Sequence, residues 1–247
     1  MESIWAIALS AMQHDASRLE RIATNLANVT TPGFKREMLV HSGRPADASA
    51  STPELAANVD MHAISRPASL HIERDVSPGT VKHTGQRLDM ALMGPGMFEL
   101  VTGSGPAYSR HGQFHLDPHG RVVNEHGHAV MGEGGEMVLV SPDVAIDAAG
   151  RITEAGRVVA TVKVVEFAEN ARFEAVGRGL YTTSLQPLAA GATATRVRQG
   201  HLENANVDVA REMVNLTQTM RHFEAMQRLT QGYDELLGTS IRKLGEF

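Results

Sequence analysis

Apolar residues recur at alternating spacings of four and three along the N-terminal end of the chain. This spacing predicts one amphipathic helix with a continuous heptad seam, because residues three and four positions apart share a helix face. The sequence Thr31-Pro32-Gly33 predicts where this helix ends, since proline disfavours helix in the residue before it. The seam consists of Trp5, Leu9, Met12, Ala16, Leu19, Ala23 and Leu26.

The C-terminal end repeats this design. A slip in phase near Met226 interrupts the alternation, and such a slip locally disturbs coiled-coil winding. Asn206 or Asp208 is expected to cap the start of this second helix. The seam consists of Val209, Met213, Leu216, Met220 and Phe223 before the slip, and of Leu229, Tyr233, Leu236 and Leu244 after it.

The middle of the chain has a different character. Residues 41–70 are small, polar and interrupted by proline, which is typical of a linker. From Gly79 to Leu188, short alternating segments are separated by glycine and Asp-Pro turns, and Val158–Phe167 is the strongest strand candidate. Because no long helical pattern interrupts these segments, the sequence favours an all-β domain over a βαβ fold.

These patterns together predict a mixed α and β fold. N- and C-terminal coiled-coil helices flank an all-β domain with a meander or sandwich-like arrangement. The expected divisions are an N-terminal coiled-coil helix and turn over 1–34, a loosely ordered linker over 35–78, an all-β domain over 79–195, and a C-terminal coiled-coil helix over 196–247.

Composition excludes several classes of protein. The chain has 247 residues and a formal net charge of -5, so it lacks the basic face typical of nucleic-acid binders. It contains no cysteine, which excludes disulfides, thiol catalysis and cysteine-based zinc sites. The N-terminus has no positively charged segment of the kind that begins a secretory signal peptide, and no apolar run is long enough to cross a membrane.

Linear signatures of catalysis are missing as well. The chain contains no GxSxG nucleophile elbow, no GxGxxG dinucleotide-binding motif and no Walker phosphate loop. We therefore expect no catalytic residues, no bound cofactor and no enzyme activity. The alternative rests on the histidines: His115 with His119, or His126 with His128, could face a metal together. Turn positions seldom supply the buried surroundings that a metal-bound histidine needs, so we expect these side chains to be exposed and metal-free.

The two helical seams allow two interpretations. The helices pack on the rest of the same chain, or their apolar faces bind other subunits. In the second case, folding of the ends and polymerisation would be one event, because an isolated helix gains its stability by burying its apolar face. Composition does not decide between the two.

The segment that follows the N-terminal helix resembles the signature of flagellar rod and hook proteins, approximately N-L-A-N-x-x-T-x-G-[FY]-[KR]. Two further stretches follow in the family's order: Leu88–Phe98 with Tyr108–Phe114, and Gln199–Asp208. The last has Ala205 where serine is commoner. The residues that match the first signature are Asn25, Leu26, Ala27, Asn28, Thr31, Gly33, Phe34 and Lys35.

This resemblance implies a structural subunit of the flagellar basal-body rod that assembles helically and transmits torque. It implies that the flagellar type III apparatus exports the chain into the periplasmic rod without a cleaved signal. The implied partners are other copies of the chain and neighbouring rod proteins, with no nucleic acid and no direct membrane insertion. Chain length and the short stretch after Gly132 favour a proximal rod subunit. The alternatives are a distal rod subunit and, from a different class, a soluble His-rich metal-binding β-domain enzyme.

The expected assembly interface combines the helical seams with the signature residues. It consists of Trp5, Leu9, Met12, Leu19, Asn25, Leu26, Asn28, Gly33, Phe34, Leu202, Asn206, Val209, Met213, Leu216, Met220 and Phe223.

Overall fold

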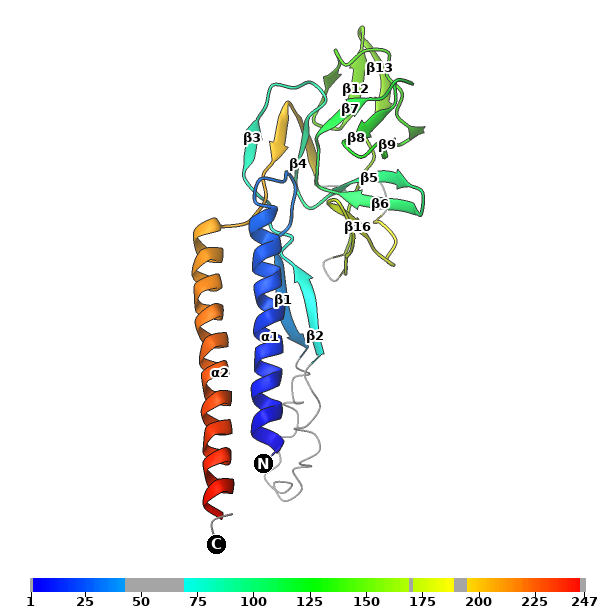
Figure 1. Ribbon diagram of the computed structural model, residues 1–247. Helices are drawn as coiled ribbons and strands as arrows, with labels where there is room; N and C mark the ends of the chain where they lie inside the picture. The colour runs from blue at the N-terminus through cyan, green and yellow to red at the C-terminus, as the bar shows by residue number, and fades with distance from the viewer. Residues whose placement is uncertain (1, 43–68, 169–170, 189–194, 245–247) are drawn as a thin grey trace, which may run out of the picture. The chain divides into compact units, whose positions relative to one another are not determined.

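The computed structural model describes the chain except for residues 1, 43–68, 169–170, 189–194 and 245–247. Along the chain, helix α1 (Glu2–Ala27) precedes a β-rich centre and helix α2 (Val209–Leu244) follows it; Figure 1 colours the elements in this order. The expected order of helix, β-rich centre and helix is therefore confirmed. The strands in the described residues are β1 Glu37–Ser42, β2 Ser69–Arg74, β3 Val81–His83, β4 Met90–Met93, β5 Met97–Thr102, β6 Gly105–Ser109, β7 Phe114–Leu116, β8 Val122–Asn124, β9 Ala129–Gly132, β10 Gly135–Glu136, β11 Ala145–Ile146, β12 Arg151–Glu154, β13 Arg157–Thr161, β14 Val164–Val165, β15 Glu174–Gly177, β16 Leu180–Thr182, β17 Arg196–Gln199 and β18 His201–Glu203.

The chain divides into two compact units. The helical unit comprises Met1–Thr24, Glu37–Arg74 and Met213–Phe247, so it contains most of α1, the β1–β2 pair and most of α2. The β unit comprises Asn25–Arg36 and Asp75–Glu212.

In the helical unit, α1 and α2 run side by side and antiparallel (Figure 1). Asp15 Oδ2 lies 2.5 Å from His222 Nδ1, and Trp5 lines a small apolar gap together with Leu229 and Tyr233. The antiparallel strands β1 and β2 are tied to α1 through Glu37, which accepts hydrogen bonds from Arg21 and Arg74.

The row of α1 that is most buried differs from the predicted seam. Ala8, Asp15 and Ile22 are buried, whereas Leu9, Ala16 and Ala23 are exposed. The other predicted row of α1, which includes Met12, Leu19 and Leu26, is half-buried. The difference arises from Asp15: a carboxylate looks unsuitable for a buried row, but its hydrogen bond with the His222 ring allows it to be buried here.

The buried row of α2 also differs, and it shows no slip in phase. Thr219 is buried, and the half-buried row continues through Met226 and Thr230 to Leu237 at spacings of four and three. Thr219 and Thr230 each donate a hydroxyl hydrogen bond to the carbonyl oxygen four residues earlier, which satisfies the hydroxyl inside the row. Both threonines are polar, so the pattern of apolar residues left them out and showed a slip in phase near Met226. The residues that are packed in the structure continue at spacings of four and three without a slip. The members of the half-buried row are Leu216, Phe223, Met226, Thr230, Tyr233 and Leu237.

The β unit is built on a nine-stranded sheet with the order β15-β16-β6-β5-β9-β8-β7, to which β10 and β14 are added. A three-stranded sheet, β11-β12-β13, and the pairs β17-β4 and β18-β3 complete the unit. The core is aliphatic, with Met90, Phe98, Leu100 and Val130 fully buried, in keeping with the low aromatic content.

One turn type recurs three times in this unit. In 117–121 and 147–151, the Asp side chain accepts backbone N–H bonds from two and four residues ahead and also binds Arg121 or Arg151. In 124–128, Asn124 accepts the same two backbone bonds. The fourth residue of each turn is a glycine with φ between 77° and 80°, a conformation that glycine adopts without steric cost.

Three expected boundaries are wrong in the structure. The Val158–Phe167 segment is not one strand, because the chain leaves the three-stranded sheet after Thr161 and joins β5 at Val164. The C-terminal helix begins at Val209, since residues 196–203 form β17 and β18, paired with β4 and β3. Strands β1 and β2 lie inside the expected 35–78 linker, and the rest of that prediction concerns 43–68, outside the described residues.

Candidate functional site: the junction of the two terminal motifs

The two signature segments from opposite ends of the sequence meet inside the β unit. Gly33 N–H donates a 2.7 Å hydrogen bond to the carbonyl oxygen of Glu203, and Asn206 N–H donates to that of Phe34 at 3.3 Å. We call this place the motif junction and define it by residues 33–36, 75–79, Arg110 and 202–212. The segment from 75 to 79 joins through the N–H of Asp75, which donates to the carbonyl of Arg36 at 2.9 Å.

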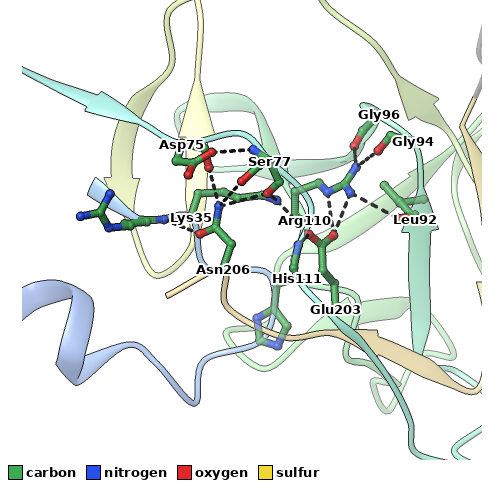
Figure 2. Close-up of polar contacts among 12 residues, drawn as sticks. Lys35, Asp75, Ser77, Leu92, Gly94, Gly96, Arg110, His111, Glu203 and Asn206 are labelled. Carbon is green, nitrogen blue, oxygen red and sulfur yellow. Dashed lines mark hydrogen bonds and ion pairs between the residues drawn. The ribbon is translucent and has the colours of Figure 1, made fainter. Parts of the chain in front are cut away.

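A buried ion cluster holds the motif junction together (Figure 2). Glu203 Oε1 accepts hydrogen bonds from Lys35 Nζ at 2.8 Å and from Gly79 N at 2.9 Å. Its Oε2 accepts from Arg110 Nε at 2.9 Å and lies 2.8 Å from Arg110 Nη2. The three charged side chains are at most 3% exposed, so solvent does not screen them.

The two cations also bind backbone carbonyl oxygens. Lys35 Nζ donates to Ser77 O at 2.7 Å. Arg110 donates to the carbonyls of Leu92 at 3.2 Å and Gly94 at 2.6 Å, and also to that of Gly96. One guanidinium thus ties the turn between β4 and β5 to β18.

The cluster contains two cations and one carboxylate. Burial lowers the pKa of Lys35, and the neighbouring charge of Arg110 acts in the same direction, against the hydrogen bond and charge of Glu203. Glu203 is therefore the carboxylate that contacts both buried cations directly, while Asp75 favours the charged form of Lys35 more weakly.

A second set of contacts anchors the start of α2. Arg36 N–H donates to the Asn206 side-chain oxygen at 2.7 Å, and Arg36 Nε lies 2.5 Å from the buried Glu212. The Asn206 amide donates to the carbonyls of Asp75 and Ser77. Asp208 accepts from Arg211 N–H at 3.2 Å, so Asp208, one of the two expected caps, caps α2.

Gly33 allows a close approach of two backbone segments in the motif junction. Its φ is +67°, and a Cβ atom built there would lie 2.5 Å from the carbonyl carbon of Arg110. Any larger residue would meet both a backbone clash and an unfavourable φ. Phe34, the next residue, is buried at 9% exposure.

The structure brings some of the predicted interface residues together and separates others. Gly33, Phe34, Leu202 and Asn206 lie in the motif junction, where Leu202 is buried within β18 rather than placed on a helix. The signature amides Asn25 and Asn28 are buried and half-buried within the β unit. The others lie on the helices: Trp5, Leu9, Val209, Met213 and Met220 are exposed, and Met12, Leu19, Leu26, Leu216 and Phe223 are half-buried.

Sequence reasoning did not assign Lys35, Arg110 and Glu203 to the site. Each is a charged residue inside one of the three motif stretches, and that shared position was the available signal. Opposite charges in separate motifs of one protein are candidates for a buried ion pair.

The histidines form no metal centre among the residues that the structure describes, where no group of three potential ligands is arranged around one point. The rings of His126 and His128 stack with centroids 6.4 Å apart. His111 is buried, and burial lowers its pKa, although the nearby Glu125 acts in the opposite direction. Neither described helix is long and apolar enough to cross a membrane.

In the motif junction, the buried side chains of Lys35, Arg110 and Glu203 are bound to one another and to the backbone. This arrangement has a structural role, because it joins distant parts of one chain. Three family models match in the order of the motifs: "Flagella basal body rod protein" over 6–35, "Flagellar hook protein FlgE/F/G D1 domain" over 91–160 and "Flagellar basal body rod FlgEFG protein C-terminal" over 198–243. The chain belongs to the flagellar basal-body rod and hook protein family.

Individual relatives align from end to end. The chain is 27% identical to the flagellar basal-body rod protein FlgG of Bacillus subtilis, over 93% of this chain and 94% of the relative. It is 25% identical to the FlgF protein of Caulobacter vibrioides, over 100% and 99%. It is 28% identical to FlgG of Buchnera aphidicola subsp. Schizaphis graminum, over 95% and 96%.

Proposed function

We propose that this chain is a structural subunit of the flagellar basal-body rod and transmits torque within it. The observation that carries the proposal is the end-to-end similarity to rod proteins, which includes both terminal motifs. The motif junction supports it, because a load-transmitting subunit needs its distant segments tied together by contacts that water does not weaken. A buried ion cluster meets this requirement.

The terminal helices are the proposed assembly surface. Large apolar side chains remain exposed on both helices, including Leu9 and Trp5 on α1 and Met213 and Met220 on α2. Full burial of one such side chain stabilises a protein by about 1.5–3 kcal/mol. Contacts between copies would therefore gain the burial free energy that a single chain does not. We propose that these faces pack as coiled coils between subunits, in accord with the seven-residue spacing of the exposed Leu9, Ala16 and Ala23 on α1 and of Met213 and Met220 on α2.

The proposed partners are other copies of the chain, neighbouring rod proteins and, during export, the flagellar type III apparatus. The proposed location is the periplasmic part of the rod, reached without cleavage of a signal peptide. No catalytic role is proposed, because the charged groups of the motif junction have structural partners.

Within the rod, we propose the proximal position and retain the distal position as the alternative. The compact stretch after Gly132, which returns directly through β10 to the three-stranded sheet, supports the proximal position.

Electron microscopy of basal bodies purified from a strain with a tagged copy tests this function. The tag is expected in the rod, at its proximal end, and its absence from basal bodies would contradict the assignment. Motility tests the helical surface: Leu19→Asp and Met220→Asp are each expected to abolish swimming while the β unit stays folded. The matched controls, Gln13→Asp and Thr217→Asp, change exposed polar residues of the same helices and should leave swimming intact.

A further inference from the structure

Several exposed apolar residues of the helical unit fall on two sides of the α1–α2 pair, whereas Val214 faces away from α1. Each helix has a central row of low exposure. On α1 the row is Ala8, Asp15 and Ile22, all buried; on α2 it is the buried Glu212 and Thr219 and the half-buried Met226 and Tyr233. A residue one position after such a row lies about 100° to one side of it, and a residue three positions after lies about 60° to the other side. Because the two helices are antiparallel and face each other, the same rotation leads to the same side of the pair on both.

The residues one position after the rows make a first patch. It contains Leu9, Ala16 and Ala23 from α1 and Met213 and Met220 from α2, all of them exposed. The exposed fractions are 55% for Leu9, 50% for Met213 and 48% for Met220. The two alanines leave a shallow region between the larger side chains.

On the opposite side lies a second patch. It consists of Ile7, one position before the α1 row, and Leu229 and Leu236, three positions after members of the α2 row. These side chains are 68%, 51% and 69% exposed. All three are large and branched, in contrast to the alanines of the first patch.

We propose that the second patch of one copy packs into the first patch of the next copy. Contact between unlike patches covers both of them with a single kind of interface, whereas contact between like patches would need two different interfaces to cover both. An interface between unlike patches is also the kind that produces open helical assemblies, while like-to-like contact closes a dimer. The proposal rests on the rod function and specifies which faces of the helical unit meet.

Cysteine cross-linking tests the proposal, because the chain has no cysteine of its own. Leu236→Cys is combined in turn with Leu9→Cys, Ala16→Cys or Ala23→Cys in the flagellated strain, and purified basal bodies are oxidised. Ala16 lies beside the level of His222, so Leu236 of the same chain is about 20 Å further along α2, too far for a disulfide within one chain. The four single-cysteine variants and the pair Gln13→Cys with Thr217→Cys are the controls.

At least one double variant is expected to give a ladder of cross-linked multimers that extends beyond the dimer, with no such ladder in any control. Dimers from a single-cysteine variant would show contact between like patches and would overturn the proposal. Absence of any ladder from basal bodies that contain the variants would also overturn it, while leaving the rod function intact. If the unmodified chain is absent from basal bodies, the rod function itself fails, and this proposal fails with it.

Discussion

Replacing Glu203 by glutamine tests whether the motif junction depends on one carboxylate. The change keeps the size of the side chain but leaves Lys35 and Arg110 as two buried cations with no anion between them. Breaking a buried ion pair costs about 3–5 kcal/mol, which corresponds to a fall in melting temperature of roughly 6–20 °C for a domain of this size. The measurement is calorimetric unfolding of the purified chain.

Two comparisons make this test specific. Asp143→Asn changes a carboxylate whose side chain is 72% exposed and paired with Arg87, and an exposed pair of this kind is worth less than about 1 kcal/mol. Lys35→Met should cost less than Glu203→Gln, because it leaves Glu203 and Arg110 as a balanced pair. A Glu203→Gln variant as stable as Asp143→Asn would refute the view that the carboxylate holds the junction together.

Two other predictions concern single positions of the β unit. Gly33→Ala should destabilise the chain by more than Gly127→Ala. Both glycines have positive φ, a conformation that costs a residue with a side chain about 1–2 kcal/mol. At Gly33 the new Cβ atom would also clash with the backbone, whereas Gly127 has open space around it. Denaturant unfolding of both variants checks this, and equal losses would contradict the close contact. Because the pKa of His111 is lowered in the folded chain, stability should fall as pH drops below about 6.5, where the unfolded chain takes up the proton more readily. His111→Gln should reduce this fall, whereas His115→Gln, a change at an exposed side chain, should not; equal pH profiles for the wild type and His111→Gln would count against the argument.

The helices were predictable as elements, but their packed faces were not. Heptad spacing located α1 and α2 correctly because amphipathic periodicity is a strong local signal. The choice of face depended on hydrophobicity alone, so the predicted seams left out Asp15, Thr219 and Thr230. Each of these polar side chains is satisfied by a partner, and for Asp15 that partner is on the other helix and beyond the reach of a local pattern.

The β unit shows the same limit. Turn signals correctly indicated a β-rich centre, since Asp, Asn and Gly at the three recurrent turns act through local hydrogen bonds. The split of the Val158–Phe167 segment between two sheets follows from long-range contacts, among them the 2.8 Å ion pair of Lys163 with Glu99. Strand β18 was likewise assigned to the C-terminal helix, because its pairing with β3 joins segments far apart in the sequence.

The motif junction gives a physical reason for the two signature segments to occur in one chain. Lys35 lies between α1 and β1, and Glu203 lies in β18 shortly before α2, so their contact joins the two segments of the β unit that connect to the helices. Within the β unit, the same carboxylate also binds Arg110, which holds the turn between β4 and β5. Force that reaches either connection would therefore act on a buried, charge-assisted cluster instead of on the ends of single strands. This kind of connection suits the proposed transmission of torque through the terminal helices.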